Sequence, residues 1–410
     1  MPRIKPFYAL RPVVHLQESV VTMPLEHYSL GQARLIASEN PNNFLHLVNP
    51  ELDNQYLRGS RQELVYKKIS ENLDNFLDHQ VLVKDELPSI YVYQVCHNGI
   101  VQTGVWTLTH IDDYLKGNIK KHELTVERRE RLLADYLQQT GIDANPVLIT
   151  YPTDQEVKLL IDEYILKAPD VAFKFEEIEH RLWLVNDTED LNQLINAFES
   201  IQTTYIADGH HRMAAMAKMA QNKRKLNSNN GDAGFNYFSS AYFSTDEVQI
   251  LAFSRLVKDL GTLTETQFFE AISVSFFVEK SELGVVPAEV HVFGMYIGSN
   301  WYKLIAKPET VNNADPIAVL DVSILQDHIL SPILKITDPR TDARIAFEGG
   351  NTPISFLKSE VDSGKYVVAF TLYPTTVQQL IAVADVDGVM PPKSTWVEPK
   401  FLVGMLTNHF

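Results

Sequence analysis

Apolar residues recur along the chain at two spacings, one typical of helices and one of strands. Ser60 and Glu63 form a capping-box pair, and the apolar residues at positions 65, 69, 73 and 76 repeat on one helix face. The runs YVYQVC and IVQTGVWTL are rich in strand-forming residues, and Asn98-Gly99 between them is typical of a tight turn. The pattern therefore predicts a helix followed by a β-hairpin.

Similar signals predict further elements. Ser29 is expected to begin a helix that ends before Pro41, and Thr153 with Glu156 to begin another. Later expected elements are strands at RLWLV and Tyr237–Phe243, a helix capped by Thr264 and Gln267, a hairpin turning at Gly298-Ser299-Asn300, a helix near Leu320–Leu334, a strand at YVVAFTLY and a last helix before Asp387-Gly388. Because strands and helices alternate irregularly, we expect an α+β fold with mixed sheets and hairpins rather than a doubly wound parallel sheet.

One segment of the chain is poor in apolar residues and rich in turn formers. It runs from Gln221 to Gly234 and reads QNKRKLNSNNGDAG, which is typical of a mobile loop or a domain boundary. A chain of 410 residues is also long for a single domain. We therefore predict a first domain over residues 1–225 and a second α+β domain over residues 235–410.

Charge and cysteine content exclude several classes of protein. The chain has 36 Lys and Arg against 52 Asp and Glu, a net charge of −16, which argues against a nucleic-acid partner because such binding needs excess cations. The single cysteine, Cys96, excludes an internal disulfide and suits a reducing compartment. Without a signal peptide or a long apolar run, we expect a cytoplasmic protein with no membrane partner. The sequence is compatible with a homo-oligomer.

The strongest local signal for chemistry is the segment TTYIADGHHR, which precedes an Ala- and Met-rich stretch. It predicts a short strand, a sharp turn at Asp208-Gly209 and an immediate helix. The first amides of a helix lack partners within it and carry the positive end of its dipole, so they attract anions. Gly209 would let a phosphate approach, Arg212 could bind it bidentately, and His210 or His211 could add a hydrogen bond or a proton.

The same residues allow simpler explanations. Asp208 could be an ordinary helix cap, and the two histidines could satisfy polar groups of the core. A structural zinc site is disfavoured, because no spaced metal-ligand pattern accompanies Asp208, His210 and His211. A magnesium ion between Asp208 and a nucleotide phosphate fits better, since Mg²⁺ takes one or two carboxylates plus substrate oxygens.

Three separated motifs resemble one family over nearly the whole chain. They are IADGHHR, the stretch GNIKKHELT with Arg128, Arg129 and Arg131 after it, and the late MPPKSTWVEPK. Together with KPFYALRP and ENPNNFLHLVNPE they resemble the uncharacterised bacterial family named domain of unknown function 1015. The Asp-Gly-His-His-Arg turn further resembles the phosphate-binding turn of the ParB/sulfiredoxin group, which includes partition proteins, ATP-using sulfiredoxins and free-serine kinases. The resemblance implies a ParB/sulfiredoxin-like, nucleotide-binding first domain.

The resemblance also implies a general base near the N-terminus. In the serine kinases an early acidic residue acts on the acceptor hydroxyl, and Glu26 occupies the matching position. The family tends to show Pro-Pro-Tyr-Asp where this chain reads Met-Pro-Leu-Glu-His-Tyr, so the substrate preference could differ. A solvated glutamate on a loop is the alternative.

Two further positions could face a phosphate. His122 lies in the most basic stretch of the chain, beside Lys120 and Lys121, although a solvated helix face would explain these charges equally well. Lys393-Ser394-Thr395 resembles the end of a Walker A loop, but Pro391-Pro392 stand where glycine is required, which excludes a P-loop. Lys393 could still reach a phosphate.

The sequence favours a nucleotide-dependent phosphotransferase, a kinase acting on an alcohol group of a small metabolite such as free serine. ATP or ADP would be the donor, with Mg²⁺ held by Asp208. The expected catalytic residues are Glu26, Asp208 and His211, and the expected nucleotide-binding residues are Asp208, Gly209, His210, His211, Arg212, His122 and Lys393. The alternatives are a non-catalytic nucleotide-binding switch module and a magnesium-dependent phosphohydrolase.

Overall fold

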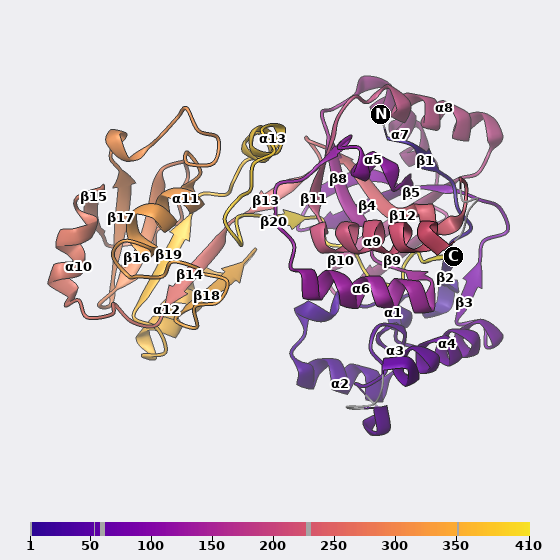
Figure 1. The fold of residues 1–410 in the computed structure, drawn as a ribbon, viewed down its shortest axis with the longest axis horizontal. Coiled ribbons are helices and arrows are strands. Elements are labelled where there is room, and N and C mark those ends of the chain that lie inside the picture. Colours follow the sequence, from indigo (N-terminus) through magenta and orange to yellow (C-terminus); the bar gives the residue numbers. More distant parts are fainter. Residues whose placement is uncertain (1, 53, 58–61, 227–230, 351) are drawn as a thin grey trace. The chain divides into compact units, whose positions relative to one another are not determined.

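The computed structural model describes residues 2–52, 54–57, 62–226, 231–350 and 352–410. The chain forms two compact units (Figure 1). The first unit comprises Met1–Lys120, Leu124–Val248 and Pro399–Phe410, and the second comprises Lys121–Glu123 and Gln249–Glu398. Helices and strands are intermixed and the larger sheet is mixed, so the α+β class predicted from the sequence is confirmed.

The units divide at a different place from the 225–235 boundary expected from composition. Strand β12, Tyr237–Ser244, follows the turn-rich segment, yet it lies in the first sheet between β8 and β5. Helix α9, His210–Leu226, also continues through the first residues of that segment, and residues 227–230 lie outside the described part. Burial of β12 against the first core therefore moves the division to Val248, and the last segment of the chain returns to the first unit.

The first unit is built on a mixed sheet of nine strands among the described residues. Among the described residues, two pairs of neighbouring strands in this sheet are parallel, β6 with β11 and β8 with β12, and the other pairs are antiparallel. Its order is β6 (Ile119–Lys120), β11 (Thr204–Asp208), β8 (Val147–Tyr151), β12, β5 (Ile100–His110), β4 (Ile90–His97), β10 (Ile178–Val185) and β9 (Val171–Phe175), with β1 (Ile4–Lys5) paired to β5. Two small ribbons add β2 (Leu10–Pro12) with β3 (Leu82–Lys84), and β7 (Ile142–Asp143) with β21 (Asn408–His409).

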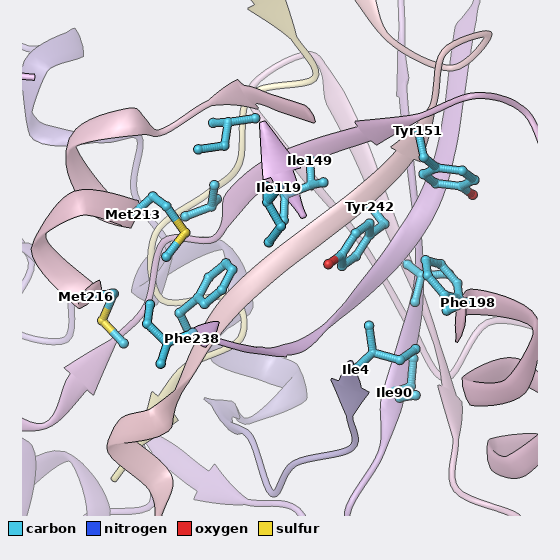
Figure 2. Packing of buried hydrophobic residues seen from close by; sticks show 14 of the residues in the cluster. Ile4, Ile90, Ile119, Ile149, Tyr151, Phe198, Met213, Met216, Phe238 and Tyr242 are labelled. Carbon is cyan, nitrogen blue, oxygen red and sulfur yellow. The ribbon is translucent and has the colours of Figure 1, made fainter. Parts of the chain in front are cut away.

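Helices cover one face of this sheet. Buried apolar side chains on that face include Ile149 of β8 and Phe238 of β12, and they meet Met213 and Met216 of α9 (Figure 2). On the other face, the ring of Phe401 lies 5.4 Å from that of Trp106 and 5.8 Å from that of Tyr93. The unit's remaining helices are α1 (Gln17–Val20), α2 (Leu30–Glu39), α3 (Leu45–Val48), α4 (Gln62–Asp78), α5 (Asp112–Leu115), α6 (Glu127–Thr140), α7 (Gln155–Ile165) and α8 (Thr188–Ser200).

The second unit contains an antiparallel sheet. Its order is β15 (Phe276–Ser281), β17 (Asn300–Ala306), β16 (Val292–Ile297), β19 (Val368–Leu372), β14 (Phe253–Val257) and β18 (Ile345–Gly349), and β13 (Gln249–Leu251) pairs separately with β20 (Trp396–Glu398). The helices are α10 (Glu265–Ile272), α11 (Asp321–Leu325), α12 (Ile354–Asp362) and α13 (Val377–Asp385), and a π-helical turn, Gln326–Leu330, extends α11.

Local sequence signals located most element ends correctly. Asn98 and Gly99 both have positive φ, +52° and +80°, and join β4 to β5, as a tight hairpin turn requires. Ser29 caps α2 and Thr264 caps α10, each in a complete capping box. The predicted Thr153 cap is wrong, because Asp154 accepts the first amides of α7. The predicted Ser60 cap lies outside the described residues.

None of the helices in the described ranges combines the length and apolar character needed to cross a bilayer.

Candidate functional site

A β-bulge sets the direction of the Asp208 side chain. Tyr205 pairs with Thr150 and Ile206 with Ile149, but Asp208 pairs with Leu148, so Ala207 is an extra residue in β11. Side chains alternate between the faces of a strand, and an unbroken register would place Asp208 with Ile206 on the apolar, helix-covered face. The bulge instead turns Asp208 to the opposite face, at the end of the strand.

Gly209 joins β11 directly to α9. Its φ is +98°, a conformation that side chains disfavour, and a Cβ atom there would lie 2.9–3.1 Å from the Arg212 guanidinium. The Gly209 carbonyl accepts the amide of Met213 at 3.0 Å, so Gly209, rather than Asp208, occupies the cap position of the helix. The first backbone amides of α9 come directly after the Asp208-Gly209 turn. Like those of any helix, they have no hydrogen-bond acceptor within the helix itself.

Arg212 folds back over the turn and binds groups of its own chain. Nη1 donates to Oδ1 of Asn145 and to the carbonyl oxygen of Pro146, and Nη2 donates to Oδ2 of Asp208 at 3.0 Å. Its side chain is 22% exposed. Arg212 thus clamps the Asp-Gly turn to the loop before β8, and its role as a phosphate ligand stays a prediction.

Positive groups surround the Asp208 carboxylate. The Nζ atom of Lys400 lies 3.7 Å from its Oδ2 atom, and the Asp208 side chain is 41% exposed. Partial removal from water raises the pKa of Asp208, but Lys400 and Arg212, then the Gly209 amide and His27, lower it more, so the pKa lies below its usual value. Asp208 is therefore an ionised carboxylate at neutral pH, reachable from solvent and flanked by two cations.

Asp143 is a second carboxyl in the electrostatic surroundings of Arg212. It is 7% exposed and its Oδ2 atom accepts the Ser239 amide at 2.7 Å. Burial raises its pKa to about 7, although the Ser239 amide and the Arg212 guanidinium lower it. Asp143 ends β7 and lies two residues before Asn145, so one short stretch before β8 carries three groups that interact with Arg212: Asp143, Asn145 and the Pro146 carbonyl.

The raised pKa predicts that Asp143 makes stability depend on pH. Between about pH 4 and pH 7 the folded protein retains a proton that the unfolded chain releases, so the free energy of unfolding falls as pH rises through this window. The loss from this group is roughly 3–4 kcal/mol. Asp143→Asn keeps an acceptor for Ser239 but cannot titrate, so urea unfolding at pH 5 and pH 8 should show a smaller pH dependence than in the wild type. Identical pH profiles for the two proteins would contradict the assignment.

The two histidines of the motif have different surroundings. His210 is buried at the start of α9. The Nδ1 atom of His211 is buried without a hydrogen-bond partner among the described residues. Burial lowers the pKa of His211, Arg129 on α6 lowers it further, and Glu130 opposes this effect. His211 is therefore neutral at pH 7 and, in this structure, is closer electrostatically to α6 than to the groups around Asp208.

Glu26 is exposed in a short 3₁₀ turn, Leu25–His27. The next residue, His27, is near enough to Asp208 to contribute to lowering the pKa of its carboxyl group. The N-terminal turn and the Asp-Gly turn therefore belong to one neighbourhood, with the Glu26 side chain at the solvent-facing side.

The other two predicted residues belong to the second unit. His122 is fully buried, and its carbonyl accepts the Met390 amide at 2.9 Å. Lys393 is exposed with a φ of +57°, and its Nζ atom lies 5.2 Å above the centre of the Phe253 ring. The structure gives both residues contacts within their own unit, and their nucleotide-binding roles stay predictions.

Sequence reasoning missed four residues around the turn: His27, Asp143, Asn145 and Lys400. The Asn145-Pro146 dipeptide is a turn signal that could have marked the loop, although not its contact with Arg212. Lys400 lies at the end of the motif MPPKSTWVEPK, but only its proximity to Asp208 distinguishes it from other lysines.

The fold and site define an α+β protein with an Asp-Gly turn that presents a carboxylate, two cations and a helix N-terminus. The chain belongs to the family described as a protein of unknown function, DUF1015, whose model matches residues 4–323. The family resemblance found in the sequence is thereby confirmed.

Several solved structures share a distant likeness. A conserved hypothetical protein from Pyrococcus furiosus is 14% identical, with 72% of this chain and 91% of that chain covered and a TM-score of 0.35. A free serine kinase in complex with AMP is 14% identical, with 73% and 91% covered and a TM-score of 0.35. SbnI with a C-terminal truncation, from Staphylococcus aureus, is 10% identical, with 72% and 82% covered and a TM-score of 0.37. Curated proteins gave no match.

Proposed function

We propose that the first unit binds ATP or ADP at the Asp208–Arg212 turn and transfers a phosphoryl group to a small hydroxyl-bearing metabolite, with free serine the first candidate. The observation that carries the proposal is the turn itself. An ionised, partly exposed Asp208 lies between Arg212 and Lys400, where a bulged strand passes through Gly209 into a long helix. The likeness of this motif to the turn of the ParB/sulfiredoxin group supports the choice of nucleotide.

The helix start supplies the anion-binding half of the proposal. Amides of the first turn of α9 and the positive end of its dipole favour a phosphate. Gly209 presents no side chain on the approach, and the Arg212 clamp holds the turn in place. Phosphoryl transfer depends mainly on such positioning and on stabilisation of charge, so it needs no unusual nucleophile.

Asp208 also fits a magnesium ion. Mg²⁺ prefers oxygen ligands and binds through one or two carboxylates together with phosphate oxygens. Asp208 is ionised and 41% exposed, so it would hold the ion from the protein side. A bound Mg²⁺ would supply neutralisation of the charge on the nucleotide phosphates.

Glu26 is the proposed base. The acceptor oxygen forms a bond to the terminal phosphorus of the nucleotide, the bond from that phosphorus to the bridging oxygen breaks, and the hydroxyl proton passes to the Glu26 carboxylate. The products are the phosphorylated acceptor and a nucleotide shortened by one phosphate. Glu26 is adjacent to His27, which is near enough to Asp208 to affect its pKa, and this placement supports the role of Glu26 as the base.

The test is phosphorus NMR on the full-length protein with Mg²⁺, serine and either ATP or ADP. Formation of phosphoserine with matching loss of the donor would establish the kinase. Donor loss with release of inorganic phosphate alone would favour the phosphohydrolase. Tight nucleotide binding without turnover, across serine and a panel of small alcohols, would favour the switch module. Absence of nucleotide binding would reject all three.

Glu26→Gln is expected to lower the rate of phosphoryl transfer by about 10²–10⁴-fold, because the amide cannot accept the proton. Nucleotide affinity should stay unchanged, since Glu26 is not proposed to contact the phosphates. Glu39→Gln, an exposed glutamate at the end of α2, is the matched control and should keep full activity. Equal rates for the wild type and Glu26→Gln would show that Glu26 is not the base, without contradicting the kinase activity itself.

A further inference from the structure

The second unit contains a buried arginine without an acidic partner. Arg255 lies on β14, between β18 and β19 (Figure 1), and is 3% exposed. No carboxylate of the described residues forms an ion pair with its guanidinium, and burial lowers the pKa of Arg255 to about 9. Arg255 is therefore a cation at neutral pH. Removal of such a charge from water is costly, and a nearby anion would offset the cost.

The Arg255 guanidinium binds the turn that precedes β20. Its Nη2 atom donates to the carbonyl oxygen of Lys393 at 3.0 Å. Two more buried side chains hold the same turn: Ser394 Oγ donates to the Pro391 carbonyl at 2.6 Å, and Thr375 Oγ1 donates to the Ser394 carbonyl at 3.2 Å. Three carbonyl oxygens of the turn are therefore occupied by side chains of the second unit.

Lys393 is held in a backbone conformation that side chains disfavour. Its φ is +57°, and it follows Pro392, whose ring fixes its own φ near −65°. Proline followed by a residue of positive φ is the pattern of a type II turn, where the residue after proline is usually glycine. Such strain persists where surrounding contacts impose it, and it is common at ligand-binding sites. A lysine where glycine would fit better indicates a task for the lysine side chain.

Several hydrogen-bond donors of this turn are not used by the protein. The amides of Lys393 and Ser394 make no hydrogen bond to any described residue. The Lys393 side chain is exposed, and its ammonium lies 5.2 Å from the centre of the Phe253 ring, without a carboxylate partner in the described part of the chain. Successive backbone N–H groups in a turn can bind anions, and a neighbouring ammonium strengthens such a site. The turn thus offers two amides and an ammonium, with the buried charge of Arg255 behind them.

We propose that the turn Pro391–Ser394 binds a phosphate group through the Lys393 ammonium and the amides of Lys393 and Ser394, with Arg255 as a positioning residue that holds the turn and adds positive charge. The inference concerns the second unit and goes beyond the proposed function, which involves the first. A phosphate group fits these donors because it presents several strong acceptor oxygens at once. The charge of Arg255 contributes because buried charges are screened less than exposed ones.

The experiment is calorimetric titration of the full-length protein with inorganic phosphate. Lys393→Gly removes the ammonium and suits the positive φ, so it should weaken phosphate binding about 10- to 100-fold while the unfolding midpoint stays equal or rises. Lys280→Met, which changes an exposed lysine of β15 in the same unit, is the matched control and should bind like the wild type. Phosphate bound at the Asp208 turn would be unaffected by both changes, so a loss confined to Lys393→Gly locates the site.

The role of Arg255 is tested by two substitutions at that position. Arg255→Lys keeps a positive charge and Arg255→Met removes it, while both lose the fork that donates to two carbonyl oxygens. Arg255→Lys should therefore retain more phosphate affinity than Arg255→Met. Equal losses in the two variants would show that the charge of Arg255 plays no part. Where either variant fails to fold, Lys393→Gly decides the proposal by itself.

Two results would overturn the site. One is a wild type that binds no phosphate, or a Lys393→Gly variant that binds it as tightly as the wild type. The other is an equal loss in Lys280→Met, which would show that only the general charge of the surface matters. Titration with methyl phosphate identifies the source of the phosphate group. Tighter binding of methyl phosphate than of inorganic phosphate, reduced in Lys393→Gly, supports a phosphate monoester as the ligand, and the reverse order with the same reduction supports the free ion.

Discussion

Asp208→Asn is expected to lower phosphoryl transfer by about 10²–10³-fold. The asparagine has nearly the same shape and can still accept a hydrogen bond from Arg212, but it has no charge for a magnesium ion or for Lys400. The measurement is the initial rate of phosphoserine formation at saturating Mg²⁺, together with the dependence of the rate on Mg²⁺ concentration.

Asp162→Asn is the matched control, because Asp162 is a surface carboxylate of the same unit and pairs with Lys158 on α7. It should keep wild-type activity. A wild-type rate for the Asp208→Asn variant would show that the carboxylate takes no part in the reaction. A thermal melt of both variants tests whether the folded state is preserved.

Arg212→Ala is expected to destabilise the first unit by about 2–4 kcal/mol. The change removes the donors to Asn145, to the Pro146 carbonyl and to Asp208 in one step. Solvent can replace part of these hydrogen bonds because the side chain is 22% exposed, so the expected loss is below that for a fully buried ion pair. Urea unfolding followed by fluorescence measures the change.

Arg131→Ala provides the comparison, since Arg131 forms an exposed pair with Glu127 one helical turn away on α6. Removal of such a pair should change the free energy of unfolding by less than about 0.5 kcal/mol. Arg212→Lys should recover only part of the loss, because one ammonium cannot reproduce the planar fork that spans the loop and the turn. An Arg212→Ala protein as stable as the wild type would show that the clamp contributes nothing to folding.

These two predictions assign different tasks to the two charges of the turn. Asp208 is partly exposed and ionised, so its loss should affect chemistry more than folding. Arg212 is tied to the protein's own groups, so its loss should affect folding first. A variant series that reversed this order would exchange the roles of the two residues.

Local patterns in the sequence determined much of the fold. The α+β class, both hairpin turns and the caps at Ser29 and Thr264 follow from the short-range conformational preferences of glycine, asparagine, serine and threonine. The segment TTYIADGHHR was likewise sufficient to predict a strand, a glycine turn and a helix, because each depends on a few neighbouring residues. The same segment was enough to suggest an anion-binding turn.

Only the tertiary structure decided which groups meet at that turn. The bulge at Ala207 arises from pairing between β11 and β8, and without it Asp208 would share the apolar face of Ile206. The clamp of Arg212 on Asn145 and the proximity of Lys400 to Asp208 join residues 67 and 192 positions apart in the chain. Periodicity and propensity describe neighbours in sequence, whereas these contacts depend on sheet register and on the return of the C-terminal segment to the first unit. The sequence therefore determined the turn, and the packing of distant segments determined the charges around it.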